Sequence, residues 1–259
     1  MNLQRFIDAK QDELAELSRC MPQPLVGIRR VDFLAALSAP PRPGLPLHVV
    51  AEFKRSSPSA GVINDSLAPA DVARQYAAGG ASCMSVLTEQ KYFTGHVQDL
   101  AAAAPAGLPL LRKDFIFHEL QVRQTFATPA SALLLIVALT PDAAHLRALR
   151  ELAEEQGIHA VVEVFTPAEL DLARESGARI IQVNARNLET FRTDREEGLK
   201  LAALRAPGEV WIAASAMSAR SHLQDAAAAG YHAALVGTAL MQPGTGTPLQ
   251  NLQRLHADE

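Results

Sequence analysis

The sequence predicts an α/β fold, a closed (β/α)8 TIM barrel preceded by an N-terminal helical extension. Short apolar runs alternate with amphipathic stretches from Leu47 onward. Hydrophobic residues make up 48% of the chain and aromatic residues only 5%, so the core is aliphatic, as in parallel strands covered by helices on both faces. A doubly wound open sheet with two extra strands is the alternative. The first run is not followed by G-x-G-x-x-G, which argues against the dinucleotide-binding form of that fold.

The first 46 residues come before the alternating pattern. Residues 3–19 have a helical apolar stripe, and residues 31–38 read as a second short helix. The stretch "APPRPGLP" then interrupts regular structure. We therefore expect an extension over 1–46, with a flap or lid as one role open to it, and a barrel over 47–259, together forming a single domain.

The barrel strands are predicted from apolar runs of four to seven residues. Stretches such as "TPDAAHLRALRELAEEQG" and "TPAELDLARESG" begin with capping or proline residues and end in glycine, as helices do. The predicted strands are 47–53, 82–87, 108–112, 131–137, 159–164, 179–184, 209–214 and 232–236.

Composition excludes several classes of function. The net charge of −4 provides no basic field for nucleic acid or an anionic membrane, and the apolar run at 131–139 is too short to span a bilayer. The N-terminus does not have the pattern of a signal peptide, and Cys20 and Cys83 match no metal spacing. The eight histidines are scattered, so we expect no metal site. We expect a cytoplasmic protein, a monomer or weak homo-oligomer, in which a small anionic ligand would have to be held by a local site.

Two carboxylates stand inside apolar runs, Glu52 in "VVAEF" and Glu163 in "AVVEVF". An unpaired buried charge is costly, but inward positions at the barrel mouth beside Lys54 and Lys113 would offset that cost. Structural ion pairs are one interpretation, and acid–base catalysis is the other. Ser57 has no adjacent His–Asp arrangement, which argues against a nucleophilic triad. The remaining polar residues at predicted strand ends are Thr88, Glu89, Arg112, Asp114, Asn184, Arg186 and Asn187.

A phosphate site is predicted near the last two strands. Gly237 and Thr238 follow a strand and begin a helical turn, where backbone N–H groups hold anions. Ser215 stands at the equivalent place after the preceding strand, and such barrels usually bind phosphate there.

These motifs together resemble the indole-3-glycerol phosphate synthase family of tryptophan biosynthesis. The resemblance rests on "VVAEFKRSSPSAGVI", "SVLTEQKYFTG", "LPLLRKDFIF", "VVEVFTPAELDLA", "IIQVNARNLETF" and "ALVGTALM", in that order along nearly the whole chain. It implies a cofactor-free ring closure of 1-(2-carboxyphenylamino)-1-deoxyribulose 5-phosphate, with loss of CO2 and water.

The resemblance also implies a role for each matched residue. Lys113 would be the general acid and Glu163 its partner carboxylate. Lys54 would act in later proton transfer, and Glu52 would hold the lysines charged. The other matched residues are Asn184 and Arg186 at the anthranilate end, Ser57 and Phe93 in the closing loops, and Ser215, Gly237 and Thr238 around the phosphate.

The chain departs from the family pattern after the seventh predicted strand. Ala214 stands where the family has glutamate, and Ala216 stands where it has glycine. Ala216 is costly if its φ is positive and tolerable otherwise. Three interpretations stay open: a synthase, at full or reduced rate; a paralogue acting on a related aryl-amino sugar phosphate; or a non-catalytic ligand-binding barrel. Ala60, Ala185 and the stretch 129–131 also depart from the family pattern.

Overall fold

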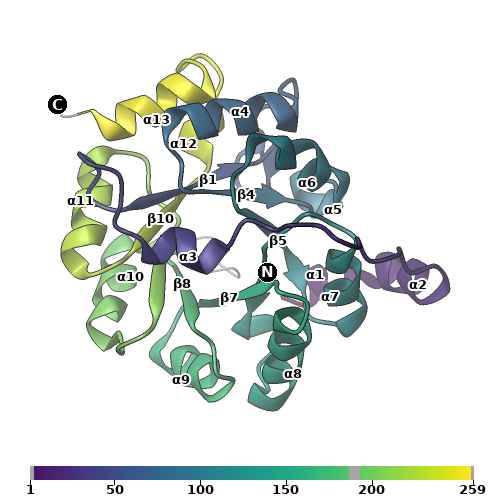
Figure 1. Ribbon diagram of the computed structural model, residues 1–259. Coiled ribbons are helices and arrows are strands. Elements are labelled where there is room, and N and C mark those ends of the chain that lie inside the picture. The colour runs from purple at the N-terminus through teal and green to yellow at the C-terminus, as the bar shows by residue number, and fades with distance from the viewer. Residues whose placement is uncertain (1–2, 187–192, 258–259) are drawn as a thin grey trace.

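Eight parallel strands close into a barrel in the computed structural model, which describes residues 3–186 and 193–257 (Figure 1). Strand β1 pairs with β10 on one side and with β4 on the other, so the sheet has no open edge. The predicted barrel is confirmed, and the open-sheet alternative is wrong. The barrel strands are β1 (His48–Phe53), β4 (Cys83–Leu87), β5 (Leu110–Ile116), β6 (Ala132–Ile136), β7 (His159–Val164), β8 (Ile180–Asn184), β9 (Val210–Ala214) and β10 (Ala233–Val236).

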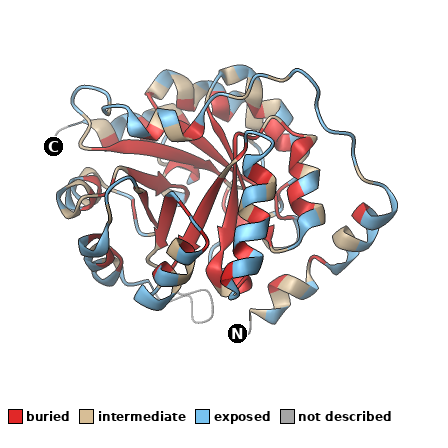
Figure 2. Ribbon diagram, turned by 60° about the horizontal axis from the view of Figure 1, so that its bottom comes forward, coloured by how far each residue is buried: buried red, intermediate tan, exposed pale blue. Residues whose placement is uncertain are grey.

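Side chains alternate between the barrel interior and the helix-facing side. In β1, Val49 and Ala51 belong to the apolar layer beneath the helices, whereas Val50 belongs to the cluster inside the barrel. The strands are buried almost throughout (Figure 2). This alternation places Glu52 and Lys54, two and four residues after Val50, on the inward side.

The helices surround the barrel. Two of them begin where the sequence predicts, with side-chain caps from Asp142 and Thr166, and α11 ends at Gly230 with φ 98°. The helices after β1 are α4 (Pro69–Gly79), α5 (Gln90–Phe93), α6 (Gln98–Ala103), α7 (Glu119–Phe126), α8 (Ala143–Glu154), α9 (Pro167–Glu175), α10 (Arg195–Leu201), α11 (Arg220–Ala229), α12 (Thr238–Met241) and α13 (Pro248–His256), with short 3-10 turns at Ala104–Ala106, Val137–Leu139 and Ala202–Leu204.

The N-terminal extension contacts both ends of the barrel. Helix α3 (Phe33–Ser38) inserts Phe33 and Leu37 into the interior cluster and lies at the amino ends of the strands, where Asp32 accepts a hydrogen bond from His159 (Figure 1). Helix α1 (Gln4–Asp8) instead packs Phe6 on Phe115, at the carboxyl end of β5. The extension therefore reaches from the bottom of the barrel to its mouth.

The segment between these helices runs along the outside of the barrel. Arg30 donates hydrogen bonds to the backbone carbonyls of Phe126, Thr128 and Ala130, and Leu25 N–H donates to Phe126. These contacts tie the linker to the end of α7.

Local structure differs from the predictions in three places. The helix predicted over 3–19 breaks into α1 and α2 (Gln11–Arg19), because Lys10 between them turns its side chain into the protein. Strand β5 continues beyond Arg112 to Ile116 through a register irregularity, so Lys113 lies within a strand. A small antiparallel hairpin, β2 (Ser56–Ser57) and β3 (Gly61–Val62), follows β1. No helix in the described ranges is long and apolar enough to cross a membrane.

Candidate active site

A cavity of about 310 Å³ opens at the carboxyl ends of the barrel strands. Its volume suits a small molecule, and every barrel strand contributes to its wall directly. All of the site residues predicted from the sequence line this one cavity: Glu52, Lys54, Ser57, Phe93, Lys113, Glu163, Asn184, Arg186, Ser215, Gly237 and Thr238. Asn187, named with them at the end of the sixth predicted strand, lies outside the described residues.

Glu52 and Lys54 form an ion pair on the cavity wall. The Lys54 ammonium lies 2.7 Å from Glu52 Oε1, and the Glu52 side chain is only 4% exposed. Burial raises the pKa of Glu52, but the positive charges of Lys54, Lys113 and Arg186 outweigh that effect, and the pKa lies below its ordinary value. Glu52 is therefore ionised at neutral pH and keeps a cation beside it.

Lys113 faces the cavity without a partner among the described residues. No hydrogen bond or ion pair within 4.0 Å engages its ammonium group there, although it lines the cavity wall. The described residues therefore do not form a structural ion pair between Lys113 and a buried carboxylate, which was one of the two interpretations of the sequence. The ammonium group is free to meet a ligand.

Glu163 is held by amides instead of a lysine. Asn184 Nδ2 donates to Glu163 Oε1 at 3.0 Å, and Gln182 Nε2 donates to Oε2. The Glu163 side chain is buried and still reaches the cavity wall. Two N–H donors hold the carboxylate in a fixed orientation.

Ser215 and Asn184 continue this chain of hydrogen bonds. The Ser215 hydroxyl donates to Asn184 Oδ1 at 2.7 Å, and the backbone N–H of Arg186 donates to the same oxygen at 3.0 Å. Asn184 thus connects the turn after β9 to Glu163. The predicted phosphate-binding hydroxyl of Ser215 is already engaged in orienting a neighbour.

Gly237 lies directly against the Glu52–Lys54 pair. A Cβ at this position would stand 2.1 Å from Glu52 Oε1 and 3.2 Å from Lys54 Nζ. The backbone φ of −121° is one that any residue adopts, so the requirement for glycine here is space. Thr238 follows it and begins the short helix α12 at the rim of the cavity.

Loops after three strands close around the mouth. Arg186 Nη1 donates to Ser59 Oγ at 3.0 Å, which joins the turn after β8 to the β2–β3 hairpin. Ser57 lies in that hairpin and accepts a hydrogen bond from the backbone N–H of Ala60. Phe93 ends α5 and packs near Phe115, and together with Phe6 they form an apolar wall of the cavity.

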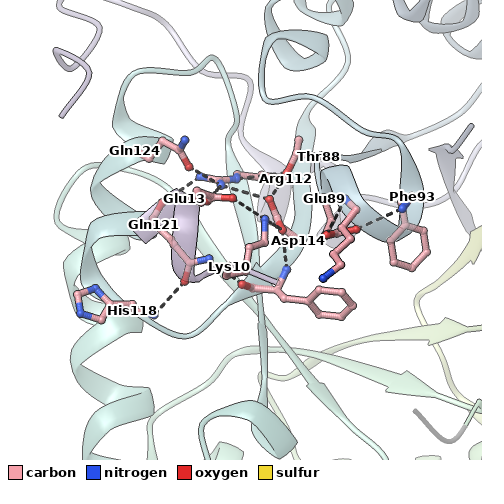
Figure 3. A network of polar contacts seen from close by, with 12 residues as sticks. Lys10, Glu13, Thr88, Glu89, Phe93, Arg112, Asp114, His118, Gln121 and Gln124 are labelled. Carbon is pink, nitrogen blue, oxygen red and sulfur yellow. Dashed lines mark hydrogen bonds and ion pairs between the residues drawn. The ribbon is translucent and has the colours of Figure 1, made fainter. Parts of the chain in front are cut away.

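A buried polar network supports the other side of β5 (Figure 3). Lys10 reaches Asp114 Oδ1 at 2.5 Å and Glu13 Oε2 at 2.7 Å, although its side chain is only 2% exposed. Burial raises the pKa of Asp114, but Lys10 and then Arg112 outweigh it and lower the pKa to about 2. Burial likewise lowers the pKa of Lys10, but Asp114 and Glu13 raise it above its ordinary value. The ion pair therefore attaches the N-terminal extension to the strand that carries Lys113.

Arg112 points away from the cavity. Its guanidinium is fully buried and donates to the Gln121 carbonyl, Thr125 Oγ1 and Gln124 Oε1 of α7 (Figure 3). Its neighbour in the network, Glu89, caps α5 through three backbone N–H groups, and burial raises its pKa despite those donors. These strand-end residues organise the mouth, and Arg112 does so without touching the cavity.

Within the described ranges, no three His, Cys, Asp or Glu side chains gather as metal ligands do. The residues that line the cavity include no histidine.

The comparisons with known proteins agree with this geometry. The model of the family described as indole-3-glycerol phosphate synthase matches residues 3–249. The chain belongs to the indole-3-glycerol phosphate synthase family. An indole-3-glycerol phosphate synthase of Acidithiobacillus ferrooxidans is 39% identical, over 99% of this chain and 98% of the relative. One from Lacticaseibacillus paracasei is 39% identical over 90% and 87%, and one from Micrococcus luteus is 38% identical over 93% and 92%.

Solved structures share the fold at low sequence identity. A 3-hexulose-6-phosphate synthase from Salmonella typhimurium superimposes with a TM-score of 0.63 at 15% identity, covering 81% of this chain and 97% of that one. A thiamine phosphate pyrophosphorylase from Pyrococcus furiosus gives 0.57 at 15% identity, covering 82% and 95%. At this identity, the likeness establishes the barrel alone.

Three of the departures from the family pattern line the cavity, namely Ala60, Ala214 and Ala216. Ala214 is buried at the end of β9, in register with Asn184 and Leu235, and presents only a methyl group. Ala216 has φ 57° and Ser215 before it has φ 70°. Ala216 therefore has the positive φ that makes alanine costly at this position, because the turn holds it in the left-handed region.

Sequence reasoning missed three residues that shape the site. Phe6 forms part of the cavity wall, Ser59 binds Arg186, and Gln182 binds Glu163. For Gln182 a signal was available, because "IIQVN" interrupts an apolar strand with a polar residue as "AVVEVF" does. Phe6 and Ser59 had no comparable signal, since their roles depend on where distant segments meet.

Proposed function

We propose that this chain converts 1-(2-carboxyphenylamino)-1-deoxyribulose 5-phosphate to indole-3-glycerol phosphate, with release of CO2 and water. The observation that carries the proposal is the unpartnered ammonium of Lys113, facing a cavity that also holds the Glu52–Lys54 pair and Glu163. Family membership and the gathering of every predicted site residue around one cavity support it.

The first step needs a proton donor at the substrate carbonyl. The ring carbon that bears the carboxylate attacks the ketone carbon, and the carbonyl oxygen takes a proton from Lys113. A cationic donor in a confined cavity stabilises the developing negative charge on that oxygen, since the surrounding dielectric is low. Loss of CO2 then leaves its bonding electrons in the ring and restores its aromaticity.

The last step removes water and needs a donor and an acceptor. Lys54, paired with Glu52, supplies the proton with which the hydroxyl departs. Glu163 is oriented by two amides, so it suits acceptance of a proton from the substrate carbon beside the nitrogen. Lys54 and Glu163 therefore have opposite roles, because Lys54 pairs with a carboxylate whereas Glu163 accepts hydrogen bonds from two amides.

The remaining residues bind the two ends of the substrate. Arg186 and Asn184 belong to the anthranilate end, where a guanidinium matches a carboxylate. Ser215, Gly237 and Thr238 belong to the phosphate end, where their backbone N–H groups and the Thr238 hydroxyl suit an anion. Ser57 and Phe93 lie in the loops that cover the bound molecule.

Ala214 supports a second candidate, turnover of a related aryl-amino sugar phosphate. A methyl group on the wall leaves room for a substituent that a longer side chain would exclude. This reaction would use the same four charged residues.

Turnover of the purified protein distinguishes the candidates. Incubation with the carboxyphenylamino-deoxyribulose phosphate should produce indole fluorescence, and Lys113→Ala should abolish it. Lys200→Ala is the matched control, because Lys200 pairs with Glu197 on the surface and does not line the cavity. Absence of product over hours, with the substrate still bound, would contradict the proposed reaction and favour the second candidate.

The cellular location and assembly belong to the same proposal. We infer a cytoplasmic enzyme, a monomer or weak homo-oligomer, in which Cys20 and Cys83 are both free thiols. Sedimentation at micromolar concentration tests the assembly.

A further inference from the structure

Gln182 is a polar residue in a part of the barrel that is otherwise apolar. It lies in β8, in register with Glu163 on one side and Ile212 on the other, and its side chain is fully buried. It does not line the cavity, whereas its strand neighbour Asn184 does. Any effect of Gln182 on a ligand must therefore pass through another residue.

The one hydrogen bond that Gln182 makes through its side chain within the described structure goes to Glu163. Its Nε2 donates to Oε2, and its own Oε1 is buried without a partner. A buried amide costs free energy unless it is hydrogen-bonded, and aliphatic residues usually fill such inward positions. Packing alone thus does not explain a glutamine at this position, whereas the hydrogen bond to Glu163 does explain it.

The strand on the other side of Glu163 offers no comparable support. The residue of β6 in register with Glu163 is Ile136, whose side chain cannot form a hydrogen bond. Asn184 is shared, since its Oδ1 also accepts from Ser215 and Arg186. Gln182 is the donor dedicated to the carboxylate.

We propose that Gln182 is a positioning residue that holds the orientation of the Glu163 carboxylate from beneath the cavity. The inference rests on the proposed function, in which Glu163 accepts a proton. A donor on Oε2 restricts the rotation of the carboxylate. Oε1 then stays directed toward Asn184 and the cavity.

Gln182→Met tests the proposal, because methionine keeps the length of the side chain and removes the donor. We expect kcat to fall about tenfold, equivalent to about 1.4 kcal/mol. We also expect a KM change of less than about twofold, since only the proton acceptor is altered and binding contacts remain.

Ser85→Ala is the matched control. Ser85 is also a fully buried polar residue of a barrel strand, but its hydroxyl has no hydrogen-bond partner within the described ranges. This variant should leave kcat and KM unchanged. An equal fall in kcat in the control would overturn the proposal, since the effect would then follow from any such substitution.

A double-mutant cycle decides whether Gln182 acts through Glu163. Gln182→Met should have no further effect on kcat in a Glu163→Gln background. Additive losses would overturn the inference while leaving the proposed function intact, whereas lack of product from the unaltered protein would contradict the proposed function itself. If Gln182→Met does not fold, Gln182→Leu gives the same test with a residue that barrel strands accept.

Discussion

The turn after β9 provides a direct test of backbone strain in the site. Ala216 has φ 57°, and its side chain is exposed. An L-residue in the left-handed region suffers a clash between Cβ and the backbone that glycine avoids. Ala216→Gly should therefore stabilise the protein, although most substitutions to glycine destabilise.

The expected gain follows from two opposing contributions. Relief of the left-handed conformation is worth roughly 1–2 kcal/mol. The greater conformational freedom of glycine in the unfolded chain reduces this gain in stability by about 0.4–1 kcal/mol. Because the Ala216 methyl group is exposed, little burial is lost. The net gain should be about 0.5–1 kcal/mol, or a rise of about 1–4 °C in Tm for a chain of this size.

Thermal and urea unfolding measure this gain against a matched control. Ala39 is also exposed, but its φ is −68°, so Ala39→Gly has no strain to relieve. That variant should lose about 0.5–1 kcal/mol through unfolded-state entropy alone. If Ala216→Gly lowers the stability as much as Ala39→Gly does, the argument from backbone strain is wrong.

Three further substitutions test the site and its support. Ala214→Glu should raise kcat/KM roughly tenfold, the worth of one charge-assisted hydrogen bond, if the site is a weakened synthase; no change or a fall in the indole assay would count against that reading. Asp114, with its pKa lowered to about 2, stabilises the fold above its unfolded pKa of 3.8 and loses that effect as pH falls toward 2. The stability gap between the parent and Asp114→Asn should hence shrink by about 2 kcal/mol between pH 7 and pH 2, and an equal gap at both pH values in urea unfolding would refute this. Gly237→Ala should push the Glu52 carboxylate off Lys54, since the new Cβ would lie 2.1 Å from Oε1, and lower kcat about a hundredfold; unchanged kcat would show that the pair is dispensable.

Much of the fold and part of the site could be predicted because they follow from local patterns. Alternating apolar runs and capped helices specify strands and their order, and short connections leave few ways to close them. Glu52 lies in β1 and Lys54 directly follows its last residue, two positions on, so the alternation of the strand directs both to the same face. Their ion pair could therefore be predicted from the sequence.

The partners of Glu163 and Lys10 were decided by tertiary structure. Glu163 meets Gln182 only because β7 and β8 pair in one register, and a shift of one residue would turn that side chain away. Lys10 meets Asp114 because the N-terminal extension folds back to the barrel mouth. The two residues are far apart in the sequence, and no local sequence pattern indicates that they pair. The sign of φ at Ala216 likewise follows from the path of the turn after β9. Hydrogen bonds and ion pairs act over about 3 Å, so the sequence by itself determined which chemical groups face the mouth, and only the tertiary structure decided which of them meet.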